Sequence, residues 1–304
     1  MAAPTNYAFL ADYRRSNFES HAHFALNKYL NPLWRSLSQA NISGKLRTHS
    51  QRLIVVVDGR PSLMLRFCVL NSLLMTGFKY KCKVFTDASS VQEMEGLFTD
   101  VFDFVEVIDL SAFDVERLTR DVYNSLLKSS QFWSEMPASS VLLTQTDALL
   151  VEPLPDDFFI YDYIGASWSP GKVISLSFPE YECGELTKYN EVWQNIVLHP
   201  NFNLPVRVGN GGHSIRGVRY MTEISSLGGS PKNEPEDIFF ARHAHSYSGC
   251  FPSISEAKRF ACETSYSFAY GVHASHLYIE ASNQSEIYER HIKHLAALYR
   301  SNCF

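Results

Sequence analysis

Residues 52–59 read RLIVVVDG, a short run of apolar and mostly β-branched residues that ends in an acid and a glycine. An unbroken apolar run of this length is typical of a strand buried on both faces of a parallel sheet. The next stretch, 61–76 (PSLMLRFCVLNSLLMT), has apolar residues at helical spacing and a proline suited to a first helical turn. A buried strand followed by such a helix predicts the first half of a β-α-β unit.

The same alternation continues along the chain. Further strands are expected at 82–87, 104–109, 140–147 and 161–166, helices at 91–98 and 122–133, and a glycine-rich strand and turn at 207–216. Strands that alternate with helices in this way predict an α/β fold with a Rossmann-like, mostly parallel sheet flanked by helices.

These boundaries divide the chain into three parts. Residues 1–50 are expected to form a helical preface, in which 21–38 carries apolar residues at helical spacing. Residues 51–280 form the main domain, with a nucleotide-binding half at 51–150 and a second half at 151–280. Residues 281–304 form a closing amphipathic helix.

Bulk composition narrows the class of protein. The 304 residues are 45% hydrophobic and 19% charged, as in globular proteins. A net charge of −5 argues against a nucleic-acid partner, which requires clustered Lys and Arg. None of the six cysteines forms a C-x-x-C pair, so we expect reduced, buried thiols. No signal peptide and no bilayer-length apolar run is visible, so a soluble, cytoplasmic protein is expected.

The triplet Gln145-Thr146-Asp147 ends a predicted strand. In an open parallel sheet, ligands bind beyond the carboxyl ends of the strands, so Asp147 should face a ligand. A divalent cation held there could neutralise the diphosphate of a nucleotide-sugar. Acids at strand ends also cap turns, and this structural role stays open.

Three further motifs have residue types suited to chemistry. Residues 208–216 (VGNGGHSIR) allow close backbone approach to a ligand, or form only a tight turn. Residues 234–238 (EPEDI) place acids at a predicted helix start, where one could be a general base or both could cap the helix. Residues 270–276 (YGVHASH) carry histidines that could bind metal or fill a structural role.

Taken together, these segments resemble a family of uncharacterised, glycosyltransferase-like proteins known only as a domain of unknown function. The matching stretches are 121–133, 141–150, 161–168, 208–216, 234–240, 256–263 and 271–273. The resemblance runs from about Arg52 to His273. It implies a GT-A-like fold, in which the first half binds the nucleotide-sugar and the second half binds the acceptor.

A looser likeness points to the fringe and core-galactosyltransferase group of inverting enzymes. That likeness implies that Asp147 and His273 hold Mn²⁺ or Mg²⁺. It makes Asp237 the base that deprotonates the acceptor, with Glu236 as the second candidate. The strand-end triplet here is Gln-Thr-Asp and not Asp-x-Asp, so a metal-independent variant stays open.

The remaining candidates border these positions, and a structural role is as well supported for each. Donor contacts are predicted for the residues at or near strand ends: Asp58, Arg60, Asp87, Gln145 and Asp147. Acceptor contacts are predicted for Trp168, Gly211, Gly212 and His213.

The resulting functional prediction is a hexosyl- or pentosyltransferase of polysaccharide or glycoconjugate biosynthesis. It would move a sugar from a nucleotide-sugar, expected to be UDP-linked, to a saccharide hydroxyl, with inversion and with a metal ion. The alternatives are a retaining transferase on the same fold, an inactive sugar-binding or scaffold module of a glycan assembly complex, and a nucleotidyltransferase. The closing helix either packs on the body or touches a membrane surface peripherally. The sequence carries no signature of an oligomeric state.

Overall fold

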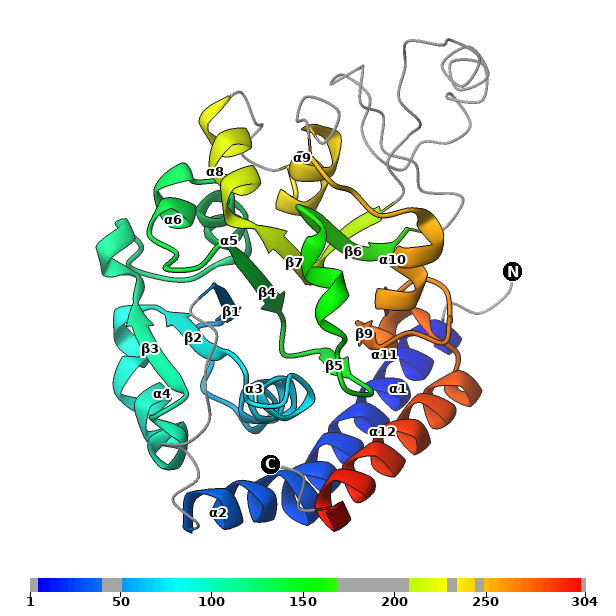
Figure 1. Cartoon of the computed structure of the whole chain (residues 1–304). Coiled ribbons are helices and arrows are strands. Elements are labelled where there is room, and N and C mark those ends of the chain that lie inside the picture. The colour runs from blue at the N-terminus through cyan, green and yellow to red at the C-terminus, as the bar shows by residue number, and fades with distance from the viewer. Residues whose placement is uncertain (1–4, 40–50, 169–207, 229–233, 244–248, 302–304) are drawn as a thin grey trace, which may run out of the picture.

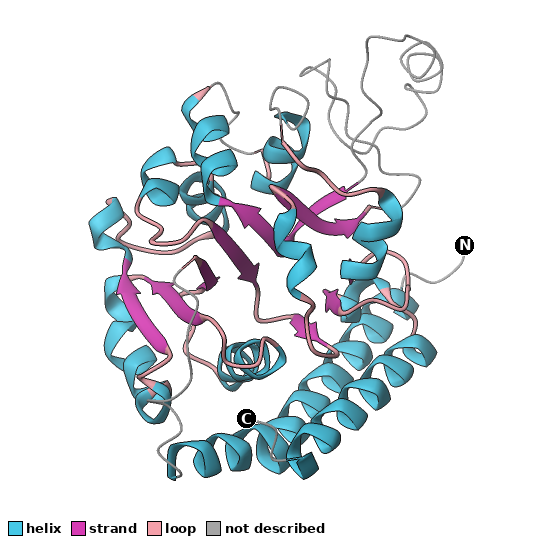
Figure 2. Ribbon diagram, in the orientation of Figure 1, coloured by secondary structure: helices cyan, strands magenta, loops and turns pink. Residues whose placement is uncertain are grey.

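The computed structural model describes residues 5–39, 51–168, 208–228, 234–243 and 249–301. It is a mixed α/β fold in which a central, mostly parallel sheet lies between two layers of helices (Figures 1 and 2). The α/β fold class predicted from the alternation of strands and helices is therefore confirmed.

The central sheet has, within the described residues, six strands in the order β3-β2-β1-β4-β7-β6. Their bounds are β1 (Arg52–Val57), β2 (Lys81–Thr86), β3 (Val105–Asp109), β4 (Ser140–Thr144), β6 (Tyr163–Ser167) and β7 (Val208–Gly217). The first four in spatial order are mutually parallel, and β7 runs antiparallel to both β4 and β6. Every predicted strand of this sheet is present, although β4 ends at Thr144 and not at Asp147.

Different helices cover the two faces of the sheet. Successive residues of a strand point to opposite faces, so each strand can contribute side chains to two apolar clusters. In β1, Ile54 and Val56 pack into one apolar cluster, and Leu53, Val55 and Val57 pack into the other. The first cluster is covered by α1 (Thr5–Ala25), a π-helical turn η1 (Leu26–Leu30), α2 (Asn31–Gln39), α3 (Leu63–Met75), α4 (Val91–Leu97), α10 (Ile254–Phe260) and α12 (Ala281–Ser301). The second is covered by α5 (Arg120–Leu127), α6 (Ser130–Ser134), α8 (Val218–Ser226) and α9 (Glu236–His243).

Two helix predictions are corrected. The helix expected at 122–133 is two short helices, α5 and α6, and α5 begins at a Thr119 cap whose side chain accepts from Val122 N. The Trp133 indole donates to Leu127 O at 2.6 Å across the break between them. The helix expected from His21 begins earlier, at Thr5. Short 3₁₀ turns, η3 (Ala88–Ser90), η4 (Thr99–Val101), η5 (Leu110–Phe113) and η6 (Asp156–Ile160), complete the connections.

A second, three-stranded sheet brings the late histidine segment to the end of β4. Its order is β5 (Ala148–Leu150), β9 (Gly271–His273) and β8 (Ala261–Cys262). In the antiparallel pair β5–β9, Ala148 is opposite His273, and Ala274 N donates to Asp147 O at 3.2 Å. The short helix α11 (Ser275–Tyr278) follows. This pairing fixes the distance between two residues that are far apart in the sequence.

The first and last described helices, α1 and α12, lie side by side against α3 (Figure 1). His21 of α1 and His291 of α12 are joined by a hydrogen bond of 2.8 Å between Nε2 and Nδ1. Asn71 of α3 accepts from Leu150 N and donates its amide to His291 Nε2 at 2.8 Å. Because an amide nitrogen can only donate, His291 Nε2 must be unprotonated, and both imidazoles are neutral. Burial lowers the pKa of His21 to about 4 and that of His291 well below its usual value.

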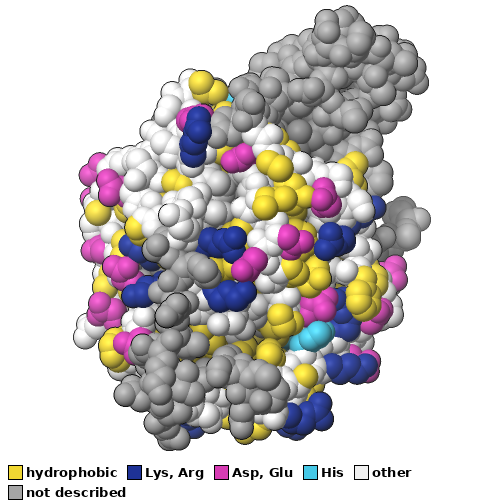
Figure 3. Space-filling view, in the orientation of Figure 1, with side chains coloured by type: hydrophobic (Ala, Val, Ile, Leu, Met, Phe, Trp, Pro, Cys, Tyr) yellow, Lys and Arg dark blue, Asp and Glu magenta, His cyan; other side chains and the backbone are white. Residues whose placement is uncertain are grey.

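The apolar side of α12 packs into the core, with Ile287 and Leu295 buried, while Lys293 is exposed. No helix among the described residues is both long and apolar enough to cross a membrane. Basic and acidic side chains are interspersed over the face seen in Figure 3. The four cysteines in the described residues are free thiols, and Cys68, Cys82 and Cys262 are buried as predicted, but Cys250 is exposed; Cys183 and Cys303 lie outside those residues.

Candidate active site

The carboxyl ends of β1 and β4 meet at one edge of the sheet, as the topology requires. Asp58 follows β1, is 8% exposed, and accepts from the backbone and side chain of Arg60 at 2.9 and 3.1 Å. Its other oxygen is 3.4 Å from the Thr146 hydroxyl of the strand-end triplet. The structure therefore brings Asp58, Arg60 and the Gln145–Asp147 triplet together. Most of the Arg60 side chain is exposed, so it can reach a bound anion.

Asp87 follows β2, the strand that pairs with β1 on the side away from β4. Its Oδ2 accepts from Leu118 N at 3.1 Å and its Oδ1 accepts from the Ser89 hydroxyl at 2.7 Å. A Cβ on Gly59 would lie 2.9 Å from Oδ2, so any larger residue there would have to displace this carboxylate. Burial alone would raise the pKa of Asp87, but these hydrogen bonds outweigh it and the pKa is lowered. Asp87 is thus an ionised, inward-facing acid that also orders the loop.

The predicted metal ligands meet directly. His273 Nε2 is 3.3 Å from Asp147 Oδ1 and 3.1 Å from Gln145 Oε1. Burial alone would lower the pKa of His273, but the ion pair with Asp147 outweighs it and raises the pKa to about 10. The pKa of Asp147 is lowered, because the same ion pair overcomes its own burial. Without a metal, the two residues form an imidazolium–carboxylate pair.

The far side of the His273 ring is held by residues that the sequence did not single out. Its Nδ1 is 3.1 Å from Asn210 Oδ1 and 3.4 Å from Glu263 Oε1. Asn210 also donates its amide to Glu263, and both residues are buried. A carboxylate or amide on the second nitrogen is the usual device that orients a histidine ligand. Glu263 ends the stretch 256–263 that carries the family resemblance, but nothing in its spacing marks it.

Asp147 and His273 are close enough together to be either a hydrogen-bonded ion pair or two ligands of one divalent cation. Two ligand atoms about 2.1 Å from a cation and at right angles to each other are about 3.0 Å apart. The 3.3 Å between Nε2 and Oδ1 is close to this value. Among the described residues, no three His, Cys, Asp or Glu side chains form a group that could hold a metal. A cation here would therefore take two charged or imidazole ligands from the protein, with Gln145 Oε1 as a neutral third.

Adjacent glycines of β7 separate the metal candidates from the base candidates. A Cβ on Gly212 would overlap the His273 ring. A Cβ on Gly211 would overlap the Glu236 carboxyl and lie 2.8 Å from Asp237 Cβ. The predicted close approach thus occurs, but in this structure it is made by the protein's own side chains. The His273 ring packs directly against Gly212, and the start of α9 packs directly against Gly211.

Replacing Gly212 by alanine should displace the His273 ring from Asp147, because the new methyl group would occupy the ring's position. We expect the melting temperature to fall by several degrees, since overpacking costs about 1–3 kcal/mol. Gly96→Ala is the matched control: nothing lies within 4 Å of a Cβ there, and alanine favours a helix. If Gly212→Ala kept wild-type stability and the His273–Asp147 pair, the contact described here would be wrong.

The two acids of α9 have different environments. Glu236 is 4% exposed, and its carboxylate forms a two-point ion pair with Arg216 at 2.6 and 2.9 Å. Asp237 is partly exposed, and its Oδ2 accepts from Gly211 N at 3.2 Å. A base must reach the acceptor hydroxyl, so Asp237 fits that role and Glu236 does not.

Two predicted acceptor contacts lie inside the protein. His213 is 1% exposed, stacks on Phe260 with ring centroids 5.4 Å apart, and bonds the Thr144 hydroxyl at 3.1 Å. Burial lowers its pKa to about 3. Trp168 is 3% exposed and packs in the second apolar cluster. Neither position presents a surface to an acceptor, because each ring is enclosed by core side chains.

Comparison with known proteins gives a family. The sequence profile of a family described as "Protein of unknown function (DUF5672)" matches residues 108–277, more than half of the chain. The chain belongs to the DUF5672 family. The DUF5672 match includes the triplet at β4, the glycines of β7, the acids of α9 and His273. It begins later than the predicted resemblance, so β1 and β2 lie outside it.

Other comparisons with this DUF5672 protein are weaker. No curated protein matches it. Among solved structures it is similar to the "PaToxG Glycosyltransferase" over 96% of this chain and 97% of that chain, with 10% sequence identity and a TM-score of 0.32. A TM-score this low does not establish a shared fold.

Proposed function

We propose that this protein is a GT-A-type glycosyltransferase that moves a sugar from a nucleotide-sugar, expected to be UDP-linked, to a saccharide hydroxyl. The observation that carries the proposal is the Asp147–His273 pair at the carboxyl end of β4, with Asp237 on the other side of the β7 glycines. Ligands of open α/β sheets bind at this edge. We expect the setting to be polysaccharide or glycoconjugate assembly in the cytoplasm, with peripheral membrane contact still to be tested.

The donor's diphosphate would lie against the edge formed by Asp58, Arg60 and Asp147. Asp147 and His273 would hold Mn²⁺ or Mg²⁺, with the Gln145 amide oxygen beside them. A bound cation would supply charge neutralisation for the departing diphosphate. Arg60 would add a mobile positive charge at the rim. His273 must release its proton to bind a cation, so metal affinity should rise with pH.

Transfer would proceed by direct displacement. The acceptor oxygen forms a bond to the anomeric carbon while the bond from that carbon to the diphosphate oxygen breaks, which inverts the configuration. The hydroxyl proton moves to Asp237. The Gly211 N–H donates to Asp237 Oδ2 and the Ile238 N–H donates to Oδ1, so two backbone groups hold the carboxylate in one orientation.

Replacing Asp237 by asparagine should lower kcat by about 10²–10⁴, because the variant cannot accept the proton. Donor affinity should change little, since Asp237 lies across the glycines from the proposed diphosphate position. Steady-state kinetics together with calorimetric donor titration separate the two. Asp121→Asn, a first-turn acid exposed on α5, is the matched control and should keep full activity. A collapse of donor affinity in Asp237→Asn would show that Asp237 is not the base.

The proposal itself is tested by incubating the protein with a panel of nucleotide-sugars, saccharide acceptors and Mn²⁺. Transfer with inversion, read from the anomeric signals of the product by NMR, is the expected result. Retention would favour a retaining enzyme on the same fold. A second candidate is a sugar-binding module without catalysis, which the neutral Gln145 in the strand-end triplet favours. Donor binding without any turnover or hydrolysis would support that candidate.

A further inference from the structure

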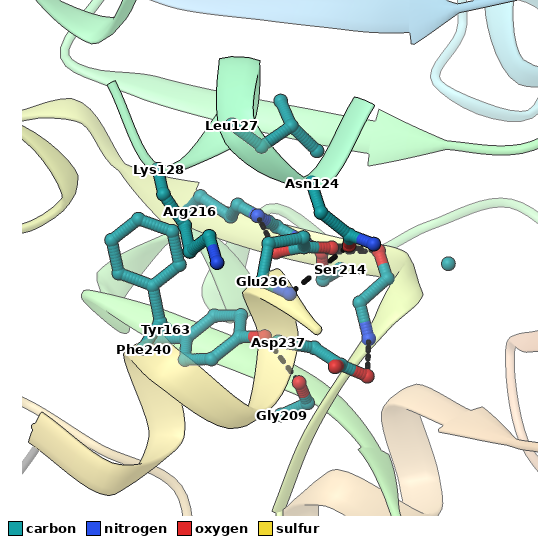
Figure 4. Close-up of polar contacts among 12 residues, drawn as sticks. Asn124, Leu127, Lys128, Tyr163, Gly209, Ser214, Arg216, Glu236, Asp237 and Phe240 are labelled. Atoms are coloured by element: carbon teal, nitrogen blue, oxygen red, sulfur yellow. Dashed lines mark hydrogen bonds and ion pairs between the residues drawn. The ribbon is translucent and has the colours of Figure 1, made fainter. Parts of the chain in front are cut away.

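Arg216 of β7 is the largest charged side chain in the described interior. It is 0% exposed, and its two terminal nitrogens pair with both carboxylate oxygens of Glu236 (Figure 4). Taking two charges out of water is costly, and apolar side chains of similar volume would often be as stable. A buried pair of this kind therefore calls for a reason beyond fold stability.

The remaining contacts of Arg216 fix its position fully. Its Nε donates to the Ser214 hydroxyl at 2.9 Å, and a terminal nitrogen donates to Gly211 O at 3.1 Å. Aromatic rings surround it, with the guanidinium carbon 5.4–5.9 Å from the centroids of Trp133, Tyr163 and Phe240. The guanidinium has a fixed planar fork, so these contacts set its direction. Arg216 thus binds the carboxylate of Glu236 and the backbone of Gly211 at once.

The segment that Arg216 holds is the start of α9. Glu236 N donates to Asn124 Oδ1 at 3.2 Å, and Lys128 Nζ donates to Glu234 O at 2.7 Å. The end of α5 therefore binds the same turn that Arg216 binds. Figure 4 shows Asn124 and Arg216 in contact with Glu236, with Lys128 nearby. The next residue, Asp237, then meets the N–H of Gly211, whose carbonyl is already bonded to Arg216.

We propose that the Arg216–Glu236 pair is a positioning device that sets the start of α9 against β7 and so aims Asp237. Glu236 does not act as the base in this arrangement, because Arg216 binds both of its carboxylate oxygens. The inference rests on the proposed function, because it assigns the purpose of the pair to the general base of that reaction. A purely structural role makes a different prediction, since any replacement that restores stability would then restore activity.

The test compares Glu236→Leu alone with the double variant Arg216→Met/Glu236→Leu. The single variant leaves a buried cation unpaired, and we expect its melting temperature to fall by about 10 °C. The double variant replaces both charges by apolar groups and should recover most of that loss. Its kcat should nevertheless stay at least 50-fold below wild type, with donor affinity within about twofold. Glu223→Gln, which breaks the exposed Arg219–Glu223 pair of α8, is the control and should change neither the melting temperature nor kcat.

A milder variant covers the case in which the double variant does not fold. Arg216→Lys keeps the charge but loses the two-point contact, so it should fold and lose about 10-fold in kcat without a change in donor affinity. Exchange of the Gly211 amide proton, followed by NMR, reports on the contact with Asp237 and should accelerate in both Arg216 variants. This readout does not depend on any activity.

The outcomes are distinct. Recovery of wild-type kcat together with stability in the double variant would overturn the positioning role, as would wild-type kcat in folded Arg216→Lys. Low kcat, recovered stability and faster Gly211 exchange would support it. If the wild type transfers no sugar, the proposed function fails, and the Gly211 exchange alone decides the geometric claim: unchanged exchange overturns it and faster exchange upholds it.

Discussion

Replacing Asp147 by asparagine is expected to lower sugar transfer by about 10³ or more while the protein stays folded. The carboxylate is the only acid of the triplet, and it lies 3.3 Å from His273 Nε2. Electrostatic stabilisation of a departing group is usually the largest catalytic contribution, and removal of one preorganised group costs about 10²–10³. Loss of the anionic ligand should also weaken Mn²⁺ binding and leave His273 without its ion-pair partner.

The measurement combines steady-state kinetics with Mn²⁺ titration followed by electron paramagnetic resonance. Asp109→Asn is the matched control, because Asp109 also ends a parallel strand but sits on the outermost one and only caps the turn that follows. It should keep wild-type kinetics and metal affinity. Full activity in Asp147→Asn would refute the metal assignment. Addition of a chelator to the wild type should mimic the variant, and the effect should reverse with Mn²⁺.

Mild acid is expected to unfold the protein, because His21 and His291 are held neutral at the contact between α1 and α12. Their pKa values are lower in the folded protein than in the unfolded chain, where histidine titrates near 6.5. Below about pH 6.5 the unfolded state therefore binds more protons, and stability falls as the pH falls. Each histidine should change the free energy of unfolding by about 1.4 kcal/mol per pH unit, so the pair should change it by about 3 kcal/mol per pH unit. This slope should hold down to about pH 4, where His21 itself titrates in the folded protein.

Denaturant midpoints measured between pH 7.5 and 4.5 check this slope. His291→Gln and His21→Gln cannot titrate, so each should flatten the dependence by about 1.4 kcal/mol per pH unit, whatever its effect at neutral pH. His23→Gln, an exposed position on α1, is the control and should leave the slope unchanged. His273 acts in the opposite direction in the upper part of this window, because its raised pKa keeps it protonated in the folded protein while the unfolded chain still titrates near pH 6.5; this contribution is the same in the wild type and in both variants. A wild-type slope retained in both variants would contradict the assignment.

The sequence was sufficient for the sheet and only partly sufficient for the site. Strands such as 52–57 are unbroken apolar runs, and strand ends follow from them, so Asp58 and Asp147 were found at the right edge. The contact between Asp147 and His273 depends on the β5–β9 pairing, and three-residue strands have too little periodicity to be recognised. The Asp147–His273 pair was predicted from the resemblance to known enzymes and not from residue spacing.

Burial accounts for most of the other differences. Glu236 and Asp237 are adjacent acids in the sequence, and only the position of Arg216 on β7 shows that Glu236 forms a buried ion pair. His213 follows two glycines and was predicted to contact the acceptor, but the alternation of β7 turns it into the core beside Phe260. Asn210 and Glu263 orient the His273 ring, and both contact it only in the folded protein. No local sequence pattern predicts these contacts.

The side-by-side arrangement of α1 and α12 has a consequence for biosynthesis. Part of the surface of α1, with its His21 imidazole, lacks its partner until the α12 segment has been synthesised, although α3, which follows early in the chain, also packs against α1. Until then the nascent protein would expose the part of α1 that α12 covers in the folded structure. A chaperone that shields this segment should raise the yield of soluble protein more than one that acts only after release.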